Sequence, residues 1–493
     1  MKRYIVSRLW KSIVSIFIVV AIVIVMVYTL IPRSQVFAND ISLTKITGNN
    51  KTIYMNNVLE DLGYLSFHTQ GEMCKYKSEN YDECMKEGSQ ELEKVRQLYE
   101  KDGYTVQELT LDDDLKGQFV AIRDYSKFEL IFRYMKNLIQ FDHKNKIQDP
   151  NNPDLERSYS FGGSGGNWGL QCSGCEYKYQ LYFNGKFPFI HQNVVKLNFG
   201  KSYPTYSGRN TLDVITDDQG KMVNIKQVFP NGKEINSPIK QDTCRYKYTP
   251  GPLDKMKFDD NYADCKTMGD APSMVSTSYI FGITSVILAY LISMPIGIHM
   301  ARKKGKFADK VGVVYINLLI AVPSLAFIFF MRYLGSKVGL PDLFPQLGFG
   351  NIKSYIMPVL ILALLSTPGI MMWLRRYMLD QASADYVKFA KAKGLSQREI
   401  FNKHILKNAI IPIVNGIPAS IILAISGAVI TETVFAIPGM GKMLPDAINA
   451  SNNNIVITLT FIFTTLSIFA VMIGDILMTM VDPRIKLDTK KED

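Results

Sequence analysis

The sequence predicts an all-α polytopic membrane protein with six transmembrane helices and a mixed α+β extracellular domain inserted between the first two. Three observations predict this class. The chain contains six apolar stretches long enough to cross a bilayer, which takes about 18 residues or more. Some 240 residues of mixed composition separate the first two stretches, and the surplus of Lys and Arg lies in short segments elsewhere. With 47% apolar and 20% charged residues among 493, the chain is too apolar to be disordered or fibrous.

The first predicted span is an uncharged run that follows four Lys and Arg residues at the start of the chain. A signal peptide is the alternative, because Val36-Phe37-Ala38 resembles a cleavage site. The run is longer than the roughly 7 to 15 apolar residues of a signal peptide, so we expect a retained span. The six expected spans are residues 13–31, 278–300, 311–330, 355–374, 411–430 and 455–480.

The formal charge of +11 is unevenly distributed. With the N-terminus inside, the inner segments contain 21 Lys and Arg against eight Asp and Glu, whereas residues 33–276 contain 31 against 33. The positive-inside rule then places both termini in the cytoplasm and the long segment outside the cell. The surplus is a topology signal, so no nucleic-acid partner is expected. The inner segments are residues 1–12, 301–310, 375–408 and 482–493.

These boundaries predict an N-terminal cytoplasmic segment with the first helix (1–33), an extracellular domain (34–276), a transmembrane domain (277–487) and a cytoplasmic tail (488–493). No inner segment is long enough for a kinase, cyclase or ATPase domain. The phosphate-binding pattern GxxxxGK[ST] is also missing from the sequence. We therefore expect a chain that is not an enzyme and has no cofactor of its own.

The long outer segment shows both helical and strand patterns. Apolar spacing predicts helices over 81–101 and 127–141, and strands over 177–183, 194–199 and 221–229. Asn184-Gly185 and Asn231-Gly232 are turn signals. The Gly-rich stretch 161–168 lacks the context of a dinucleotide site, so we interpret it as a linker loop.

All six cysteines lie in the outer segment, where disulfides are expected. Cys172 and Cys175 form a close pair, but no second pair or adjacent His suggests a metal or redox site. We expect structural disulfides and no metal, and the residues alone leave all 15 pairings open. The cysteines are Cys74, Cys84, Cys172, Cys175, Cys244 and Cys265.

The inner loop 380–408 carries the most informative motif. Gly394 can end a first helix in the left-handed conformation, and Ser396 and Glu399 form a capping box that begins a second. Apolar and basic residues alternate, so each helix is amphipathic. A basic helix on the inner leaflet is one interpretation, and a rigid knob for a partner's groove is the other.

A family resemblance favours the second interpretation. Measured from Leu379, the loop resembles the EAA motif of binding-protein-dependent ABC importer permeases at Gly394, Leu395, Phe401, Leu406 and Lys407. The triplet itself departs from the motif and is Lys388-Phe389-Ala390, but residues 385–396 are similar to the oligopeptide subfamily's version. Further stretches in family order resemble oligopeptide permeases of the B type, so the resemblance covers 1–33 and 277–487. They are residues 3–9, 373–379, 432–441 and 475–484.

The resemblance implies a type I ABC importer permease fold and a permease subunit of an ATP-driven oligopeptide importer in a bacterial cell membrane. The chain would form half of the peptide path beside a second homologous permease, as a heterodimer surrounded by membrane lipid. Two cytoplasmic ABC ATPases would hold ATP and Mg, and an extracellular oligopeptide-binding lipoprotein would deliver the peptide.

The resemblance implies an ATPase-coupling site in the inner loop. A translocation path or gate is expected near Glu432, an ionisable residue at the point where the fifth span leaves the membrane. Asp475 is expected to contact Arg375 or Arg376 at an inner helix end, and Pro323, Pro358 and Pro368 to kink their helices. The coupling residues are Lys388, Phe389, Ala390, Ala392, Gly394, Leu395, Ser396, Glu399 and Phe401. The path residues are Glu432, Phe435, Pro438, Met440 and Pro323.

Fragments of one short family loop also occur in the outer segment, at 134–139, 198–202 and 213–215. They imply three insertions, at about 34–90, 143–197 and 216–274, as in streptococcal oligopeptide permeases of the AmiC kind with an enlarged outer domain. Each insertion contains one cysteine pair. The resemblance therefore implies the pairings Cys74 to Cys84, Cys172 to Cys175 and Cys244 to Cys265.

Two other classes compete with the permease. A membrane receptor or sensor with a disulfide-bonded extracellular ligand-binding domain is the alternative function, and the shortness of the inner segments, which hold no output domain, counts against it. A membrane-bound enzyme would need a nucleophile or metal constellation. His68, His143 and His191, the histidines of the outer segment, are widely spaced and outside recognisable motifs.

Overall fold

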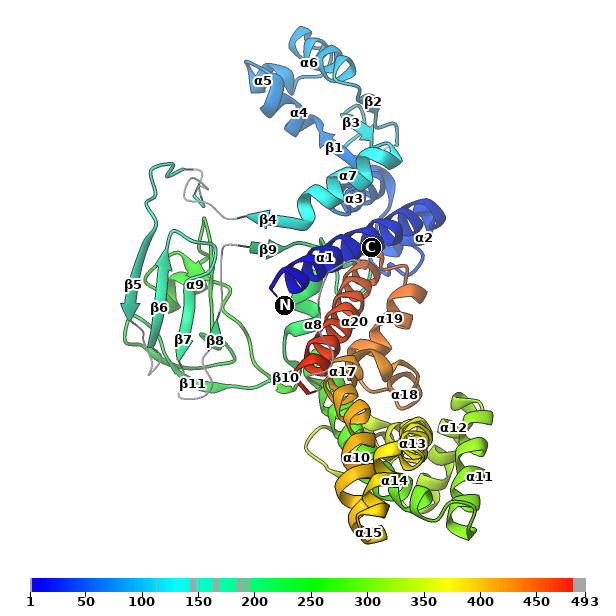
Figure 1. The fold of residues 1–493 in the computed structure, drawn as a ribbon. Helices are drawn as coiled ribbons and strands as arrows, with labels where there is room; N and C mark the ends of the chain where they lie inside the picture. Colours follow the sequence, from blue (N-terminus) through cyan, green and yellow to red (C-terminus); the bar gives the residue numbers. More distant parts are fainter. Residues whose placement is uncertain are drawn as a thin grey trace. The chain divides into compact units, whose positions relative to one another are not determined.

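The chain divides into two compact units (Figure 1). The helical unit comprises residues 1–20, 271–446 and 459–493, and the strand-rich unit comprises 21–270 and 447–458. Two long helices, α1 (Lys2–Leu30) and α20 (Asn453–Val481), contribute residues to both. The computed structural model describes residues 2–111, 113–141, 148–149, 151–162, 168–183, 189–190 and 195–481.

In the helical unit, α10 packs along α13 and α17, and α11 packs against α10 and α13. The elements between residues 274 and 449 are α10 (Met274–Arg302), α11 (Phe307–Ala321), α12 (Ser324–Lys337), η2 (Phe344–Gln346), α13 (Lys353–Ala382), α14 (Asp385–Ala392), α15 (Gln397–Glu399), the π-helix η3 (Ile400–Ile405), α16 (Leu406–Ala409), α17 (Ile411–Gly427), α18 (Val429–Val434) and α19 (Met440–Asn449).

Five helices of the described chain are long and apolar enough to cross a membrane: Val6–Leu30, Met274–Arg302, Lys353–Ala382, Ile411–Val434 and Asn453–Leu477. A bend is present at Pro323, as expected, but the span predicted over 311–330 is not one kinked helix: α11 and α12 are separate helices that meet there at 108°. Pro323 explains the break, since a proline forces the preceding residue out of the helical region. Val322 accordingly has φ −74° and ψ 128°. The pair makes a sixth span only if both helices count as one.

The prolines of α13 have a different effect. Pro358 and Pro368 both lie inside this continuous 30-residue helix. Pro368 has no N–H to donate to the carbonyl oxygen of Leu364. The Thr367 hydroxyl donates to that oxygen instead, at 2.8 Å. A side chain one residue away thus satisfies the group that the proline leaves free, as membrane helices require.

The strand-rich unit contains antiparallel sheets and short helices. One sheet has the order β1-β3-β2, a four-stranded sheet has the order β5-β6-β7-β8, and four pairs complete the set: β10-β15, β11-β12, β13-β14 and β4-β9. Its strands are β1 (Leu65–Thr69), β2 (Thr105–Glu108), β3 (Phe119–Asp124), β4 (Ile139–Phe141), β5 (Ser158–Gly162), β6 (Trp168–Ser173), β7 (Tyr179–Phe183), β8 (Phe189–Ile190), β9 (Val195–Leu197), β10 (Gln219–Met222), β11 (Ile225–Val228), β12 (Glu234–Ser237), β13 (Arg245–Tyr246), β14 (Tyr262–Ala263) and β15 (Gly269–Ala271).

The helices of this unit are α2 (Arg33–Val36), η1 (Leu43–Lys45), α3 (Gly48–Asp61), α4 (Gln70–Lys77), α5 (Tyr81–Cys84), α6 (Gln90–Lys101), α7 (Lys127–Leu138), α8 (Thr211–Thr216) and α9 (Pro252–Lys257). The continuous helix predicted over 81–101 is wrong. Ser89 interrupts it, because its side chain accepts a hydrogen bond from the N–H of Leu92 and begins α6.

Two further boundary predictions are wrong. The helix predicted over 127–141 ends at Leu138, because residues 139–141 pair with β9 as a strand. The strand predicted over 221–229 is divided between β10, which pairs with β15, and β11, which pairs with β12. Asn231-Gly232 forms the turn between β11 and β12, as predicted. The predicted turn at Asn184-Gly185 lies outside the described residues, as do the central residues of the Gly-rich stretch, whose ends belong to β5 and β6.

The fragments that resemble one family loop lie together in space. Residue 139 pairs with residue 197 in the β4-β9 ladder, and the Tyr134 hydroxyl donates to the carbonyl oxygen of Phe199 at 3.1 Å. Phe199 and Ile215 are both buried. Segments far apart in sequence thus form one contiguous part of the strand-rich unit.

Three consecutive asparagines attach the start of α20 to this part. The Asn452 amide donates to Ser202 Oγ and to Thr205 Oγ1, both at 2.8 Å. Asn453 donates to the Tyr64 hydroxyl and Asn454 to the carbonyl oxygen of Lys201, again at 2.8 Å. All three asparagines are buried. Asn452 also accepts from the N–H of Ile455 at 3.3 Å, which caps α20.

Replacing Asn452 with alanine should loosen this attachment. The substitution removes the helix cap and leaves the buried Ser202 hydroxyl without its donor, at a cost of about 2 kcal/mol. Hydrogen exchange of residues 200–211 in the full-length protein should therefore accelerate. Asn449→Ala, at an exposed position of α19, is the matched control and should leave exchange unchanged. Equal protection in both variants would contradict this role.

Candidate functional site

The predicted coupling loop consists of α14, a tight turn and the α15-η3-α16 segment. Gly394 has φ +80° and ends α14, a backbone conformation that side-chain-bearing residues rarely adopt. Its N–H donates to the carbonyl oxygen of Lys391 at 2.9 Å, and the N–H of Leu395 donates to that of Ala390 at 3.3 Å. The left-handed glycine that the sequence predicts is therefore present, and it reverses the chain between the two helical segments.

The predicted capping box begins the second segment. The Ser396 hydroxyl and backbone N–H donate to Glu399 Oε2 at 2.8 and 3.1 Å, and the N–H of Glu399 donates to Ser396 Oγ at 3.3 Å. The hydrogen bond from the Ser396 hydroxyl lowers the pKa of the Glu399 carboxyl below its usual value of 4.5. These reciprocal bonds fix the direction of the chain immediately after Gly394.

One face of the loop is buried against the transmembrane helices. A single apolar cluster, called here the loop core, joins the inner faces of α14, η3 and α16 to α10, α13 and α17. Leu395 and Phe401 pack against it while partly exposed. The loop core consists of Ala301, Leu374, Met378, Val387, Ala390, Ile400, Ile405, Ala409 and Ile413.

The opposite face of the loop is exposed. Phe389 leaves 70% of its surface accessible, the largest apolar surface on this face. Lys388, Ala392, Gly394 and Ser396 are exposed around it. Of the nine predicted coupling residues, Ala390 alone is buried, and Leu395, Glu399 and Phe401 are intermediate. The predicted set thus divides into residues that anchor the loop to the transmembrane helices and exposed residues that a partner could contact.

A buried ion pair that the sequence analysis missed supports the same end of the unit. Arg375 Nε donates to Asp309 Oδ1 at 2.6 Å, and its Nη2 donates to Oδ2 at 2.9 Å. The N–H of Gly305 also donates to Asp309 Oδ2, at 2.8 Å. This fork connects the α10-α11 turn to α13. The lone acid among five basic residues in 301–310 was a signal for such a pair.

The predicted contact of Asp475 with Arg375 or Arg376 is wrong. Asp475 pairs with Arg8 of α1 at 2.5 Å. Arg375 is occupied by Asp309, and the Arg376 guanidinium lies 5.3 Å from the centre of the Trp373 ring. The N-terminal basic cluster, which the sequence analysis used only for topology, therefore includes a side chain that ties α1 to α20.

Four of the five predicted path residues lie close together in the chain, and three of them, Glu432, Phe435 and Met440, are buried. Ser278 Oγ donates to Glu432 Oε1 at 2.7 Å, and the N–H of Lys442 donates to Oε2 at 2.9 Å. A Cβ at Gly439 would lie 2.4 Å from Glu432 Oε2. In this chain Glu432 therefore holds α10, α18 and α19 together. Pro438 is partly exposed and Pro323 is exposed.

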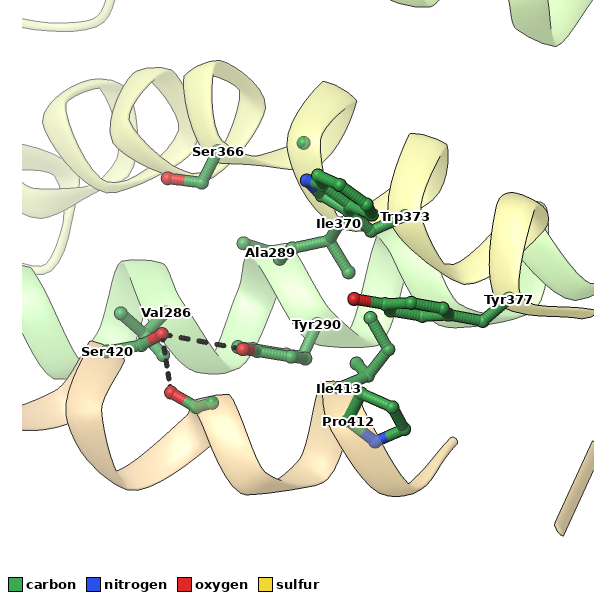
Figure 2. A pocket seen from close by; sticks show the side chains of 12 residues that line it. Val286, Ala289, Tyr290, Ser366, Ile370, Trp373, Tyr377, Pro412, Ile413 and Ser420 are labelled. Atoms are coloured by element: carbon green, nitrogen blue, oxygen red, sulfur yellow. Dashed lines mark hydrogen bonds between the residues drawn. The ribbon is translucent and has the colours of Figure 1, made fainter. Parts of the chain in front are cut away.

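A groove of about 420 Å³, which sequence reasoning did not identify, lies between α10, α13 and α17 (Figure 2). One face of α13 contributes Ser366, Gly369, Ile370, Trp373 and Tyr377, which occupy positions i, i+3, i+4, i+7 and i+11 of a single helix face. Trp373 and Tyr377 stack with ring centres 5.6 Å apart. The remaining lining residues are Val286, Ala289, Tyr290, Pro412, Ile413, Gly416 and Ser420.

The groove combines apolar and hydroxyl groups without any formal charge. Ser420 donates to the carbonyl oxygen of Gly416 at 2.9 Å and lies 3.4 Å from the Tyr290 hydroxyl (Figure 2). Ser366 donates to the carbonyl oxygen of Leu362 at 3.0 Å. The sequence signal for this groove was the alternation of small and aromatic residues along α13, but the same alternation also occurs in ordinary packed helices.

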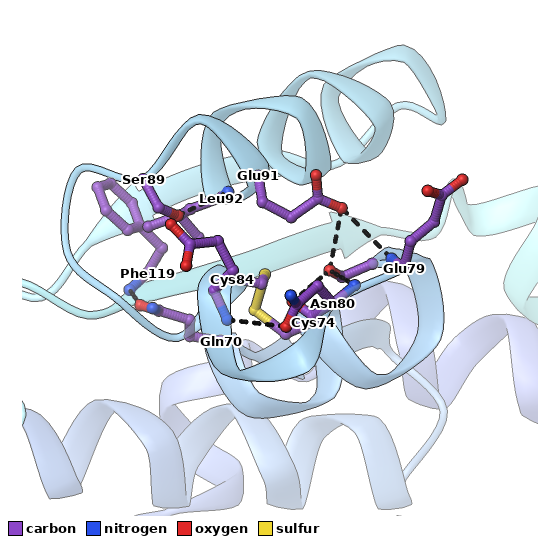
Figure 3. The surroundings of a disulfide bond; sticks show 11 residues. Gln70, Cys74, Glu79, Asn80, Cys84, Ser89, Glu91, Leu92 and Phe119 are labelled. Atoms are coloured by element: carbon purple, nitrogen blue, oxygen red, sulfur yellow. Dashed lines mark hydrogen bonds between the residues drawn. A yellow bond between two sulfur atoms is a disulfide. The ribbon is translucent and has the colours of Figure 1, made fainter.

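The structure contains three disulfides, and they join the pairs that the resemblance implies: Cys74–Cys84, Cys172–Cys175 and Cys244–Cys265. All six cysteines are buried. Figure 3 shows the first, which connects α4 to α5 beside α6 within an apolar cluster. The Tyr262 hydroxyl bonds to the carbonyl oxygens of Cys172 and Cys175 at 2.9 and 3.0 Å, which links the second disulfide to the region of the third.

Comparison with known proteins identifies relatives over the whole chain. The family described as binding-protein-dependent transport system inner membrane component matches residues 293–487. The oligopeptide transport system permease protein AmiC of Streptococcus pneumoniae is 44% identical, over 99% of both chains. The dipeptide transport system permease protein DppB of Lactococcus lactis is 31% identical over 42% of this chain and 67% of its own. A solved structure of the MetNI methionine ABC transporter covers 42% of this chain and 94% of its own, with 15% identity and a TM-score of 0.34.

The capping box predicts a pH-dependent loop. Because the folded state lowers the pKa of Glu399 below 4.5, its stabilisation is complete above that pH and is lost as the pH falls through the folded pKa. Hydrogen exchange of residues 396–400, corrected for intrinsic rates, should therefore show protection at pH 6 that declines below about pH 4.5. Glu399→Gln can still accept from Ser396 but cannot titrate, so its protection should not change over this range. The same decline in both proteins would refute the assignment.

Proposed function

Because the chain belongs to the oligopeptide permeases of the binding-protein-dependent transport family, we propose that its 385–409 loop couples peptide passage to ATP hydrolysis in a partner. As a member of this family the chain is a membrane permease of an oligopeptide transport system with the type I ABC permease fold. It is not itself an enzyme. The observation that carries the proposal is the two-sided loop, which is buried on one face and presents Phe389 on the other.

The two faces suit the transmission of a movement. A partner that binds the exposed face can displace the loop only together with the loop core, because Val387, Ala390 and Ile400 are buried in that cluster together with residues of α13. Closely packed interfaces change between discrete arrangements rather than deforming gradually. A change of the bound ATPase would therefore be passed to the helices that line the groove.

The rest of the assembly follows from the family. The proposed transporter contains a second homologous permease, as a heterodimer, and two cytoplasmic ATPases that hold ATP and Mg. Six spans cross a bacterial cell membrane, with the bent α11-α12 pair as one of them and both termini in the cytoplasm. The proposed coupling face consists of the five exposed residues of the predicted coupling set, which are Lys388, Phe389, Ala392, Gly394 and Ser396.

The strand-rich unit is proposed as an extracellular domain inserted between the first two spans. The contiguous family fragments and a disulfide within each of the three sequence insertions support this arrangement. We propose that the unit docks the oligopeptide-binding lipoprotein, because it lies on the face where peptide arrives. The family assignment gives no support to a sensor, which was the alternative function.

Phe389→Ala should uncouple transport. Truncating a central aromatic of an interface typically costs about 2 kcal/mol or more of binding, so peptide uptake should fall at least about tenfold. The protein should stay folded in the membrane, because Phe389 is 70% exposed. Uptake of labelled peptide by cells that depend on this transporter, with the amount of membrane protein measured alongside, tests the prediction.

Phe307→Ala provides the matched control. Phe307 is 82% exposed at the start of α11 and outside the loop, so its truncation should leave uptake near the wild-type level. Normal uptake by Phe389→Ala, or equal losses in the two variants, would remove the support for a coupling face centred on Phe389.

A further inference from the structure

We propose that the groove between α10, α13 and α17 binds an uncharged stretch of the transported peptide. In this proposal the stacked Trp373 and Tyr377 rings take an apolar side chain, and the hydroxyls of Tyr290, Tyr377 and Ser420 meet peptide N–H and C=O groups. The inference rests on the proposed function and adds the position and chemistry of a substrate contact. The groove's volume of about 420 Å³ lies within the roughly 300 to 1,000 Å³ of small-ligand sites.

The lining chemistry selects the kind of ligand. None of the described residues that line the groove is Asp, Glu, Lys, Arg or His, so this lining offers no ion-pair partner to a charged side chain. Peptides of varied sequence share their backbone amides and differ in their side chains. Hydroxyl groups that can both donate and accept, beside flat aromatic surfaces, suit that mixture without demanding one sequence.

A lipid chain is a poorer occupant than a peptide. Hydroxyl and indole N–H groups at membrane depth are costly when they face hydrocarbon, which can accept no hydrogen bond. The Tyr377 hydroxyl makes no hydrogen bond to any of the described residues, and Trp373 leaves 42% of its surface exposed. A peptide can supply the missing partners, whereas an acyl chain cannot.

The middle of the groove is kept open by a glycine. A Cβ at Gly369 would meet nothing within 4 Å, so close packing against a neighbouring helix does not explain this residue. The neighbouring Ser366 is also small and exposed. Free space beside an aromatic wall is what an incoming side chain requires.

The groove also shares residues with the apolar cluster that supports the coupling loop. Ile413 belongs to the loop core, and Tyr290 and Tyr377 pack against it. A ligand in the groove would therefore contact side chains that belong to or pack against the cluster in which Val387 and Ile400 are buried. Substrate and ATPase would act on one packed cluster from two directions.

A thiol in the groove tests the proposal. All six cysteines of the chain are in disulfides, so Gly369→Cys supplies its only free thiol. In the assembled transporter, a saturating mixture of uncharged penta- and hexapeptides should slow alkylation of this thiol by a small water-soluble reagent about tenfold, as expected when the mixture is present at ten times its dissociation constant. Gly474→Cys on α20, where a Cβ also meets nothing within 4 Å, is the matched control and should show no protection.

The outcomes separate this inference from the proposed function. Wild-type cells that fail to take up the peptide mixture would refute the function itself. Uptake by Gly369→Cys without any peptide protection of its thiol would refute the groove as a substrate site. If Gly369→Cys is not found in the membrane, Ser366→Cys at the exposed neighbouring position replaces it with a change of one atom.

Filling the groove provides a second test. Gly369→Trp should lower uptake of the mixture at least about tenfold, because that is the effect of a tenfold weaker affinity for peptide. Gly474→Trp should leave uptake near the wild-type level. The amounts of both proteins in the membrane should match. Full uptake by Gly369→Trp would overturn the proposal, and so would competition by free phospholipid, but not by peptide, for the Gly369→Cys thiol.

Discussion

Burial of one face of the 385–409 loop is the interaction on which the proposed coupling depends. The eight-residue helix α14 is too short to be stable by itself in water, and it persists because Val387 and Ala390 are buried in the loop core. Each fully buried aliphatic side chain contributes about 1.5 to 3 kcal/mol. The same packing leaves Phe389 facing outward. Without the buried face, the exposed face would have no fixed position at which a partner could bind.

The loop core also connects the groove to the loop. Tyr290, Tyr377 and Ile413 contact the core and line the groove. The bidentate Asp309–Arg375 pair holds the adjoining turn to α13, and Glu432 secures the remote end of the unit through Ser278 and the 439–442 backbone. The Asp309–Arg375 pair and the Glu432 hydrogen bonds therefore lie on either side of a region of apolar contacts. Apolar contacts can shift without the loss of a salt bridge or of a hydrogen bond to a charged group.

Local chemistry made much of this predictable from sequence. The spans follow from apolar runs, Gly394 and the Ser396–Glu399 box from cap chemistry, and the disulfide pairs from the family's interrupted loop. The bend at Pro323 was underestimated, because the apolar run continues through it. Partners that are distant in the sequence were not predictable. Helix packing places Arg375 beside Asp309 and not beside Asp475, and the groove is formed by three helices that are far apart in the sequence. The division of 81–101 at Ser89 shows the same limit, since apolar spacing continues across a break set by a single cap.

The direct test of the coupling role is site-specific cross-linking in the assembled transporter. Ala392→Cys, at an exposed position of the same face, gives this chain a single free thiol, because its own cysteines are all in disulfides. A short reagent that reacts with the thiol at one end and carries a photoactivated group at the other should join that position to an ATPase subunit, whereas a thiol placed at Phe307 should not be joined. A transporter that imports peptide but yields no cross-link from position 392 to an ATPase would contradict the assignment of this face.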